Sequence, residues 1–130
     1  MKKRKEQKTM SNLVNLYGRF SFRAWDENIQ DYWDWEELQE DWESEGYYDS
    51  VFRQDHWVCE QCTGIKDKNN KYIFENDLLK DHNGIWQVKW NDKEAAFYLW
   101  NKKRDFYLSP FIGEYEIVGN IHENGDLLDE

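Results

Sequence analysis

The spacing of hydrophobic residues changes along the chain, from a helical period in the first half to a strand-like one in the second half. Trp35, Leu38 and Trp42 recur at intervals of three and four residues, so a helix would place them on one face. Gly46 follows at the point where such a helix would end. The pattern therefore predicts a helix over residues 33–45.

Short β-type stretches occupy much of the remaining chain. Residues 19–25 (RFSFRAW) alternate apolar and polar side chains, which favours a strand. From Val51 onwards, apolar stretches of similar length are separated by clusters of turn-forming residues. Strands this short, with turns this regular, indicate a small barrel or sandwich rather than parallel βαβ units. The clearest stretches are Ile85–Trp90, Ala95–Trp100, Phe106–Phe111 and Tyr115–Ile121.

The composition is typical of a folded domain with a very polar surface. A length of 130 residues fits one domain with at most a small appended element. Only 39% of the residues are hydrophobic, which would suggest disorder, but 18% are aromatic and can form a bulky core. No run approaches the ~20 apolar residues of a membrane span, and no signal-peptide core follows the basic start. Two cysteines are too few for a disulfide framework, so we expect a reducing cytosol.

The net charge of −10 is distributed unevenly. Residues 1–18 hold five basic residues and one acidic residue, a charge of +4. Residues 19–60 hold three basic and thirteen acidic residues, a charge of −10, and residues 61–130 hold nine basic and thirteen acidic residues, a charge of −4. An acidic protein repels phosphate at long range, so any binding of nucleic acid would have to be local.

Both cysteines lie in the stretch DHWVCEQC, in which His56 precedes Cys59 by three residues. Zinc takes four ligands, so a single pair of cysteines with His56 would still lack one. A redox pair would need a following helix N-terminus to lower the thiol pKa, and TGIKDKNNK predicts no helix. We therefore interpret Cys59 and Cys62 as structural residues on opposite faces of a strand, with zinc binding and then redox chemistry as the alternatives.

Four segments carry sequence motifs in a definite order and spacing: FRAWDE (Phe22–Glu27), QCTGIKDKNNKYIFENDLL (Gln61–Leu79), WQVKWNDKEAAFYL (Trp86–Leu99) and EIVGNIHENGDLL (Glu116–Leu128). Together they resemble the YopX family of bacteriophage and prophage proteins. Two glycines of the family pattern are replaced here by Asn70 and Asn76. Asparagine also accepts the left-handed backbone conformation that such turns need, so the turn chemistry is kept.

The resemblance implies a helical N-terminal part joined to a β-barrel similar to SH3 folds, with a tendency to self-associate, and it implies no particular reaction. Together with the pattern of elements it predicts an α+β chain, in which an acidic N-terminal helical element is joined to a small SH3-like β-barrel. We expect a flexible basic lead-in over residues 1–18, a strand and the acidic aromatic helix over residues 19–55, and the SH3-like β-barrel domain over residues 56–130.

The acidic helix is the first candidate for function. Its N-terminal cap is expected at Asp31 or Asp34. The carboxylates are spread around the helix rather than along a tight loop, so a solvated face is the simplest interpretation and a cation site is not indicated. As a functional hypothesis, an acidic surface with aromatic anchors would bind a host or phage protein and imitate DNA phosphates, as a host-takeover or anti-defence inhibitor would. The candidate partner-binding residues are Trp33, Trp35, Glu36, Glu37, Glu40, Trp42 and Glu43.

The alternative is a nucleic-acid-binding SH3-like module that uses a basic hairpin and the N-terminal arm. Lys102, Lys103 and Arg104 are followed closely by Tyr107, which combines cations for phosphate with an aromatic ring for base stacking. A charged hairpin tip is the simpler interpretation of the same residues.

We expect no enzymatic activity, no cofactor and no metal site. The glycines are isolated, so no phosphate-binding loop is present, and the three histidines form no catalytic pattern. The expected partner is a host or phage protein in the cytoplasm of a bacterial host cell, without membrane binding. A homo-oligomer is also expected, and Trp35, Leu38 and Trp42 would be buried between its subunits.

Overall fold

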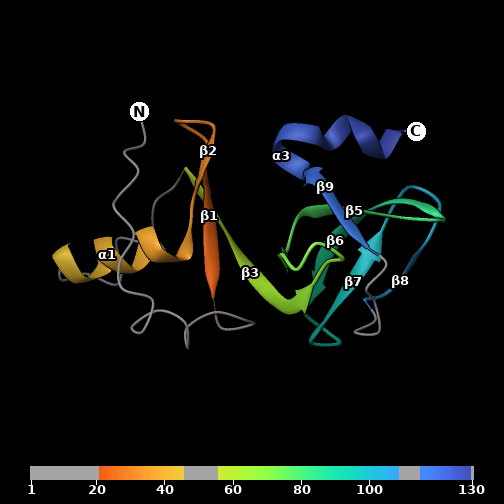
Figure 1. The fold of residues 1–130 in the computed structure, drawn as a ribbon, viewed down its shortest axis with the longest axis horizontal. Coiled ribbons are helices and arrows are strands. Elements are labelled where there is room, and N and C mark those ends of the chain that lie inside the picture. The colour runs from red at the N-terminus through yellow and green to blue at the C-terminus, as the bar shows by residue number, and fades with distance from the viewer. Residues whose placement is uncertain (1–20, 46–55, 109–114, 130) are drawn as a thin grey trace. The chain divides into compact units, whose positions relative to one another are not determined.

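The computed structural model describes residues 21–45, 56–108 and 115–129, with side chains in the first range described up to residue 40. This part of the chain is a small fold of mostly β structure with few helices (Figure 1). It falls into two compact units that divide between Gln61 and Cys62. The predicted basic lead-in over residues 1–18 lies outside the described residues.

The N-terminal unit is built on β1 (Phe22–Asp26), which pairs antiparallel with β2 (Asp31–Trp33) and with the first half of β3 (Trp57–Lys66). Ala24 lies opposite Trp33 on one side and opposite Cys59 on the other. Helix α1 (Trp35–Glu45) follows β2 directly. The core of this unit is a cluster of three buried residues, with partly buried aromatic side chains around it: Ala24, Trp35 and Leu38, packed against Phe22, Trp33 and Trp57.

The helix begins at Trp35, two residues later than the spacing of hydrophobic residues predicts. Trp33 belongs to β2 instead, because its backbone pairs with Ala24 of β1. Asp34 is the residue that caps the helix, since its carboxylate accepts a hydrogen bond of 2.9 Å from the backbone N–H of Glu37. The short strand β2 was not predicted, and Arg19 and Phe20 of the predicted first strand lie outside the described residues.

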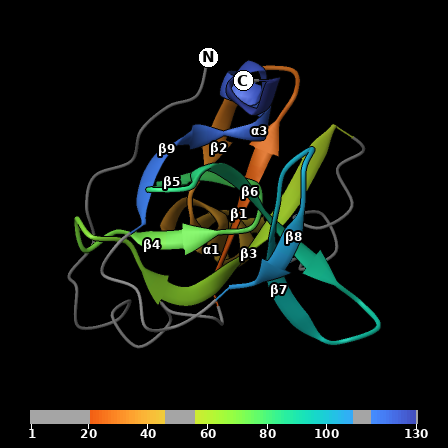
Figure 2. The same ribbon diagram turned by 90° about the vertical axis from the view of Figure 1, so that its right-hand side faces the viewer.

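The C-terminal unit contains a five-stranded antiparallel sheet in the order β8-β7-β6-β5-β9 (Figure 2). Trp86, Val88 and Leu99 point to one face of this sheet and form its buried core together with Leu79 and Leu108. A short strand, β4 (Tyr72–Phe74), pairs with the second half of β3. The five strands of the sheet are β5 (Asp77–Asp81), β6 (Gly84–Asn91), β7 (Ala96–Trp100), β8 (Asp105–Tyr107) and β9 (Glu116–Asn120).

The turn between β3 and β4 is held by the buried carboxylate of Asp67. It accepts backbone hydrogen bonds of 2.9 Å from Asn69 and from Lys71, and one of 3.1 Å from Ile117 of β9. Burial raises the pKa of Asp67, but these three hydrogen bonds and the nearby charge of Lys71 lower it by more, so its pKa lies below the ordinary value. One side chain thus joins the KDKNNK turn to β9.

Asn70 and Asn76 have positive φ angles of 65° and 71°. The prediction that both asparagines adopt left-handed turn conformations is confirmed.

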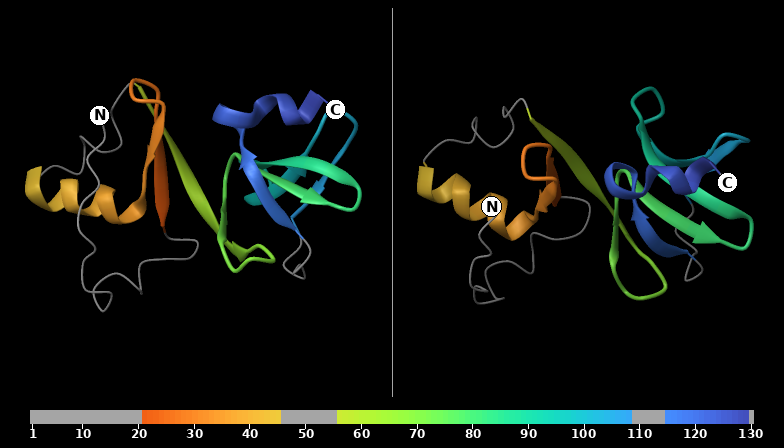
Figure 3. Two further views of the ribbon diagram at one scale, coloured as in Figure 1. Left: turned by 45° about the horizontal axis from the view of Figure 1, so that its top comes forward. Right: turned by 90° about the horizontal axis from the view of Figure 1, so that it is seen from above.

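The last residues that the structure describes are helical, which the pattern of the sequence does not predict. The pattern places Ile121 in the last predicted strand, whereas in the structure Ile121 begins the short helix α3 (Ile121–Asn124), which a 3₁₀ turn over Gly125–Asp129 continues (Figure 3). The side chain of Asn120 caps α3 by accepting hydrogen bonds from the backbone N–H groups of His122 and Glu123. The predicted strand Phe106–Phe111 is described only up to residue 108, where β8 covers Asp105–Tyr107.

Candidate functional site

The N-terminus of α1 carries a capping box that is formed within the chain. Asp34 accepts from the backbone of Glu37, and the carboxylate of Glu37 accepts in return from the backbone N–H of Asp34 at 3.0 Å. This reciprocal pair satisfies two donors at the helix N-terminus. Glu37 is buried as a result, so one of the predicted partner-binding carboxylates stabilises the helix.

Two of the predicted aromatic anchors lie inside the N-terminal unit. Trp35 is 8% exposed and packs in the core cluster with Leu38 and Ala24, and its ring lies 5.9 Å from that of Phe22. Trp33 is partly buried and its ring lies 5.9 Å from that of Trp57. The helical face predicted for contacts between subunits therefore packs, at Trp35 and Leu38, within one chain.

Glu36 and Glu40 are partly exposed on α1, one helical turn apart. They are the members of the predicted acidic surface that remain in contact with solvent within the described side chains. Trp42 and Glu43 belong to the predicted set as well, but their side chains lie outside the described residues. The described part of this surface thus consists of two carboxylates without an exposed tryptophan.

Asp26 is a highly connected acidic residue among the described residues of the N-terminal unit. Its Oδ2 atom accepts hydrogen bonds of 2.9 Å from the indole groups of both Trp33 and Trp57. Its Oδ1 atom accepts from the backbone of Asn28 and Ile29, at 2.9 Å and 3.4 Å. Burial raises the pKa of Asp26, but these hydrogen bonds outweigh burial and bring the pKa below its ordinary value. A carboxylate held in this way connects β1, β2 and β3 and is poorly suited to proton transfer.

A second buried carboxylate, Glu60, is paired within the same unit. Its Oε1 atom accepts hydrogen bonds of 2.8 Å from Arg23 and 2.9 Å from the hydroxyl of Tyr32. The guanidinium of Arg23 also lies 4.2 Å from the centre of the Tyr32 ring. A fully buried ion needs such partners to offset its loss of hydration, so Arg23 of the FRAWD motif serves the fold.

The two cysteines lie on one strand, β3, as predicted. Both are free thiols, with Cys62 fully buried and Cys59 partly buried against the core of the N-terminal unit. Burial raises the pKa of the Cys59 thiol, and the charge of Glu60 raises it further. Within the described residues, no group of three or more His, Cys, Asp or Glu side chains could hold a metal ion.

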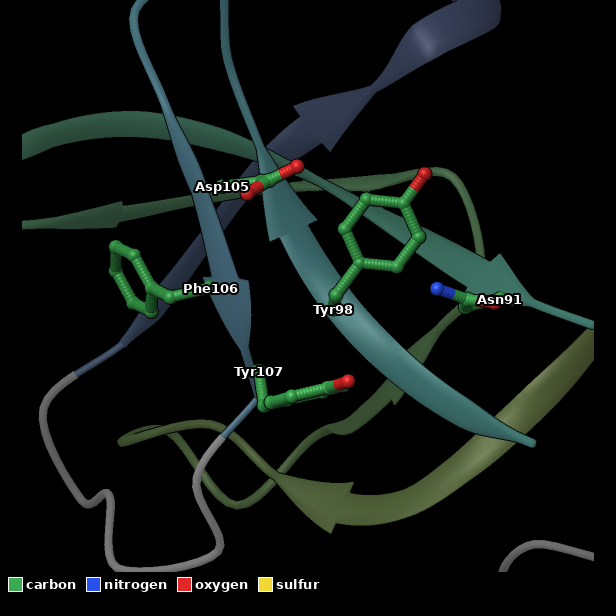
Figure 4. A pocket seen from close by; sticks show the side chains of 5 residues that line it. All are labelled: Asn91, Tyr98, Asp105, Phe106 and Tyr107. Carbon is green, nitrogen blue, oxygen red and sulfur yellow. The ribbon is translucent and has the colours of Figure 1, made fainter. Parts of the chain in front are cut away.

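The basic hairpin does not present its predicted residues on one surface. Lys102 forms an ion pair with Asp129. The guanidinium of Arg104 lies 5.6 Å from the ring of Trp86 and 5.8 Å from that of Phe106. Tyr107 points to the opposite face of β8 from Phe106 (Figure 4). Lys103 is exposed in the turn, and Arg104 lies on the face of β8 opposite to Tyr107.

A small pocket of about 300 Å³ lies on the outer face of β6, β7 and β8. Tyr98 of β7 is the direct cross-strand partner of Tyr107 on β8 and of Lys89 on β6. Sequence reasoning missed this site, although the alternation of AFYLW predicts that Tyr98 and Trp100 point away from the buried Leu99. The pocket is lined by Asn91, Tyr98, Asp105, Phe106 and Tyr107 (Figure 4).

None of the helices in the described ranges combines the length and the apolar character that a membrane crossing requires.

Comparison with known proteins gives one family and one fold. A model of the YopX protein family matches residues 21–129. No curated protein sequence gives a significant match. Among solved structures, the crystal structure of protein EF1440 from Enterococcus faecalis is similar, with a TM-score of 0.56 and 23% sequence identity. The similarity covers 83% of this chain and 96% of that one, and at this identity it concerns the fold alone.

Proposed function

The chain belongs to the YopX family, a family associated with bacteriophages and prophages, and from that premise we propose that it acts by binding another protein. The observation that carries this proposal is a set of three partly exposed aromatic side chains on one sheet, with Trp90 and Phe106 on one face and Tyr107 on the other. Trp90 and Phe106 are each 37% exposed and Tyr107 is 54% exposed, all on β6 and β8. Exposed aromatic side chains on a rigid sheet supply the anchors that protein interfaces use.

We propose further that this protein is not an enzyme. The support comes from the two carboxylates whose pKa values are lowered, Asp26 and Asp67. Backbone donors hold both in their charged form, and two indole groups also donate to Asp26. A general acid or base needs a pKa near the working pH. Both residues serve the packing of β1 and the β3–β4 turn instead.

The proposed partner is a basic protein of the host or the phage. A net charge of −10 accelerates encounters with a positively charged partner and slows those with nucleic acid. In the finer version of this proposal, the acidic surface of the N-terminal unit imitates DNA phosphates towards a host defence or DNA-binding protein. Glu36 and Glu40 are the described residues that would carry it.

The acidic surface is tested by reversing charges without disturbing the helix cap. The double variant Glu36→Lys, Glu40→Lys keeps Glu37 in its capping box. This variant and the native protein are each used as bait in bacterial cells infected by a phage. We expect the captured partner to be lost. The matched control is Asp92→Lys with Asp126→Lys, which changes the net charge equally at exposed positions in the C-terminal unit. If both double variants capture the same amount of partner, the acidic-surface hypothesis is wrong. The exposed aromatic residues of the sheet would then be the remaining candidate for the binding surface.

We also propose an SH3-like barrel as the fold of the C-terminal unit and a homo-oligomer as the assembled state. Short antiparallel strands in the order β8-β7-β6-β5-β9 support the barrel.

Light scattering on the purified protein tests the oligomer, and a mass of 16.0 kDa would identify a monomer. Nucleic acid retained at low salt and released steeply as salt rises would favour the alternative of a nucleic-acid-binding module.

A further inference from the structure

The outer face of β6, β7 and β8 carries a row of three side chains that the sheet register brings side by side. Lys89, Tyr98 and Tyr107 are consecutive cross-strand partners. Such partners have Cβ atoms ~4.5–5.5 Å apart, so the two tyrosine rings are immediate neighbours. Figure 4 shows Tyr98, Tyr107 and Asn91 around one hollow, with Phe106 on the other side of β8. The pocket volume of about 300 Å³ lies at the lower end of the range of small-molecule sites.

The charges at this pocket are negative. Asp105 lines it directly. The hydroxyl of Tyr107 forms a hydrogen bond with Glu94, and both Glu94 and Asp105 raise the pKa of Tyr107, so both carboxylates lie close to its ring. Asp105 and Glu94 are themselves exposed. The pocket therefore combines two aromatic rings, the amide of Asn91 and the carboxylate of Asp105, and the carboxylate of Glu94 lies at the hydroxyl of Tyr107.

Two positive groups near the pocket, those of Lys89 and Arg104, lie against aromatic rings. The ammonium group of Lys89 lies 4.0 Å from the centre of the Trp100 ring. The guanidinium of Arg104 lies near the rings of Trp86 and Phe106, on the other face. The contact between Lys89 and Trp100 also shows that this face of the sheet accepts an ammonium group over an aromatic ring, where the negative quadrupole of the ring attracts the cation.

We propose that this pocket binds the cationic side chain of a lysine or arginine in an extended segment of a basic partner protein. The inference rests on the proposed function, because it names where such a partner makes contact. The rings of Tyr98 and Tyr107 would contact the methylene stem and the cationic head, and Asp105 would form the ion pair. Phosphate is disfavoured because two carboxylates stand at the site. A peptide suits the location because β8 is an edge strand of the described sheet, and an extended segment can lie alongside such an edge.

The test is titration of the isotope-labelled full chain with a short peptide rich in lysine and arginine, followed by NMR. We expect the backbone signals of Asn91, Tyr98, Asp105 and Tyr107 to shift, and a peptide with glutamine at every basic position to leave them unchanged. Asp105→Asn should weaken binding by about tenfold and Tyr98→Leu by about three- to tenfold. The matched control Asp92→Asn removes the same charge from the neighbouring turn and should change the affinity by less than about twofold.

Shifts confined to Glu36 and Glu40, or unchanged affinity in both pocket variants, would overturn the pocket and leave the proposed binding function intact. Absence of any shift with the peptide, while the protein still captures its partner from cells, would equally overturn the pocket. Dispersed spectra of Asp105→Asn and Tyr98→Leu would establish that each variant is folded, and Tyr98→Phe, which keeps the aromatic ring, should restore binding.

Discussion

The indole Nε1 of Trp57 donates a hydrogen bond of 2.9 Å to Oδ2 of Asp26, although 31 positions separate the two residues in the chain. Trp33 donates to the same oxygen. One buried carboxylate therefore fixes the orientation of two tryptophans on two different strands. This arrangement gives the aspartate of the FRAWD motif a structural purpose.

Replacing Asp26 by asparagine is expected to lower the free energy of unfolding by about 2–4 kcal/mol. The amide has one acceptor oxygen in place of two, so an indole or backbone donor loses its charged partner while it stays buried. Urea unfolding followed by tryptophan fluorescence measures the loss, because Trp33 and Trp57 report on the site directly. Glu27→Gln, an exposed neighbour, serves as the control and should cost less than about 0.5 kcal/mol. Equal stability of both variants would contradict this account of Asp26.

Stability is expected to fall in acid through Asp26 and Asp67. Both have native pKa values below the ordinary value, so their contribution is fully present above the unfolded pKa of ~3.9 and is lost as the pH falls through the native values. Urea unfolding at a series of pH values measures the slope of the free energy of unfolding against pH. The double variant Asp26→Asn, Asp67→Asn should show a shallower dependence below pH ~4. An unchanged slope would mean that other carboxylates cause the acid sensitivity.

The sequence predicted best the features that depend on local chemistry. Turn residues such as Asn70 and Asn76 carry their backbone preference with them, and alternation located β6 and β7 to within one residue at each end. The start of α1 was wrong because Trp33 is held by pairing with β1, a long-range contact. Helical spacing also could not distinguish a binding face from a buried one, since Trp35 and Leu38 need the same spacing for either purpose. The pocket depends on cross-strand neighbours, which one strand alone does not reveal.

Asn70 offers a direct test of backbone strain, because its φ of 65° lies in the left-handed region. Asn70→Val should lower the free energy of unfolding by about 1–2 kcal/mol, whereas Asn70→Gly should leave it unchanged or raise it by up to about 1 kcal/mol. Chemical unfolding of both variants checks the prediction. Asn69 is exposed in the same turn without a positive φ, so Asn69→Val should cost less than Asn70→Val. The reverse order would exclude strain as the cause.

The two thiols are expected to differ in reactivity. Iodoacetamide should label Cys59 in the native protein more slowly than free cysteine at neutral pH, because its raised pKa leaves little thiolate. Labelling of Cys59 should accelerate as the pH rises. Cys62 is fully buried and should react only after denaturation. Peptide mapping by mass spectrometry distinguishes the sites. Rapid native labelling of Cys62, or about one equivalent of zinc bound per chain, would overturn the structural interpretation of the pair.

Gly119 lies so close to Asn124 that a side chain at position 119 would collide with it. A Cβ atom there would lie 2.3 Å from Oδ1 of Asn124 and 2.9 Å from its Cβ, while the same Oδ1 accepts a hydrogen bond from the backbone of Asn120 at 3.2 Å. Gly119→Ala should therefore lower the free energy of unfolding by about 1–3 kcal/mol.

A double-mutant cycle separates this collision from a general cost of replacing the glycine. Asn124→Ala alone loses the hydrogen bond to Asn120, which costs about 1 kcal/mol, but it removes the atoms closest to position 119. Adding Gly119→Ala to Asn124→Ala should then cost less than it does in the native background, so the two losses should be non-additive. Urea unfolding of the four proteins measures the coupling. Strict additivity would show that the glycine is needed for a reason other than the packing of Asn124 at the end of α3.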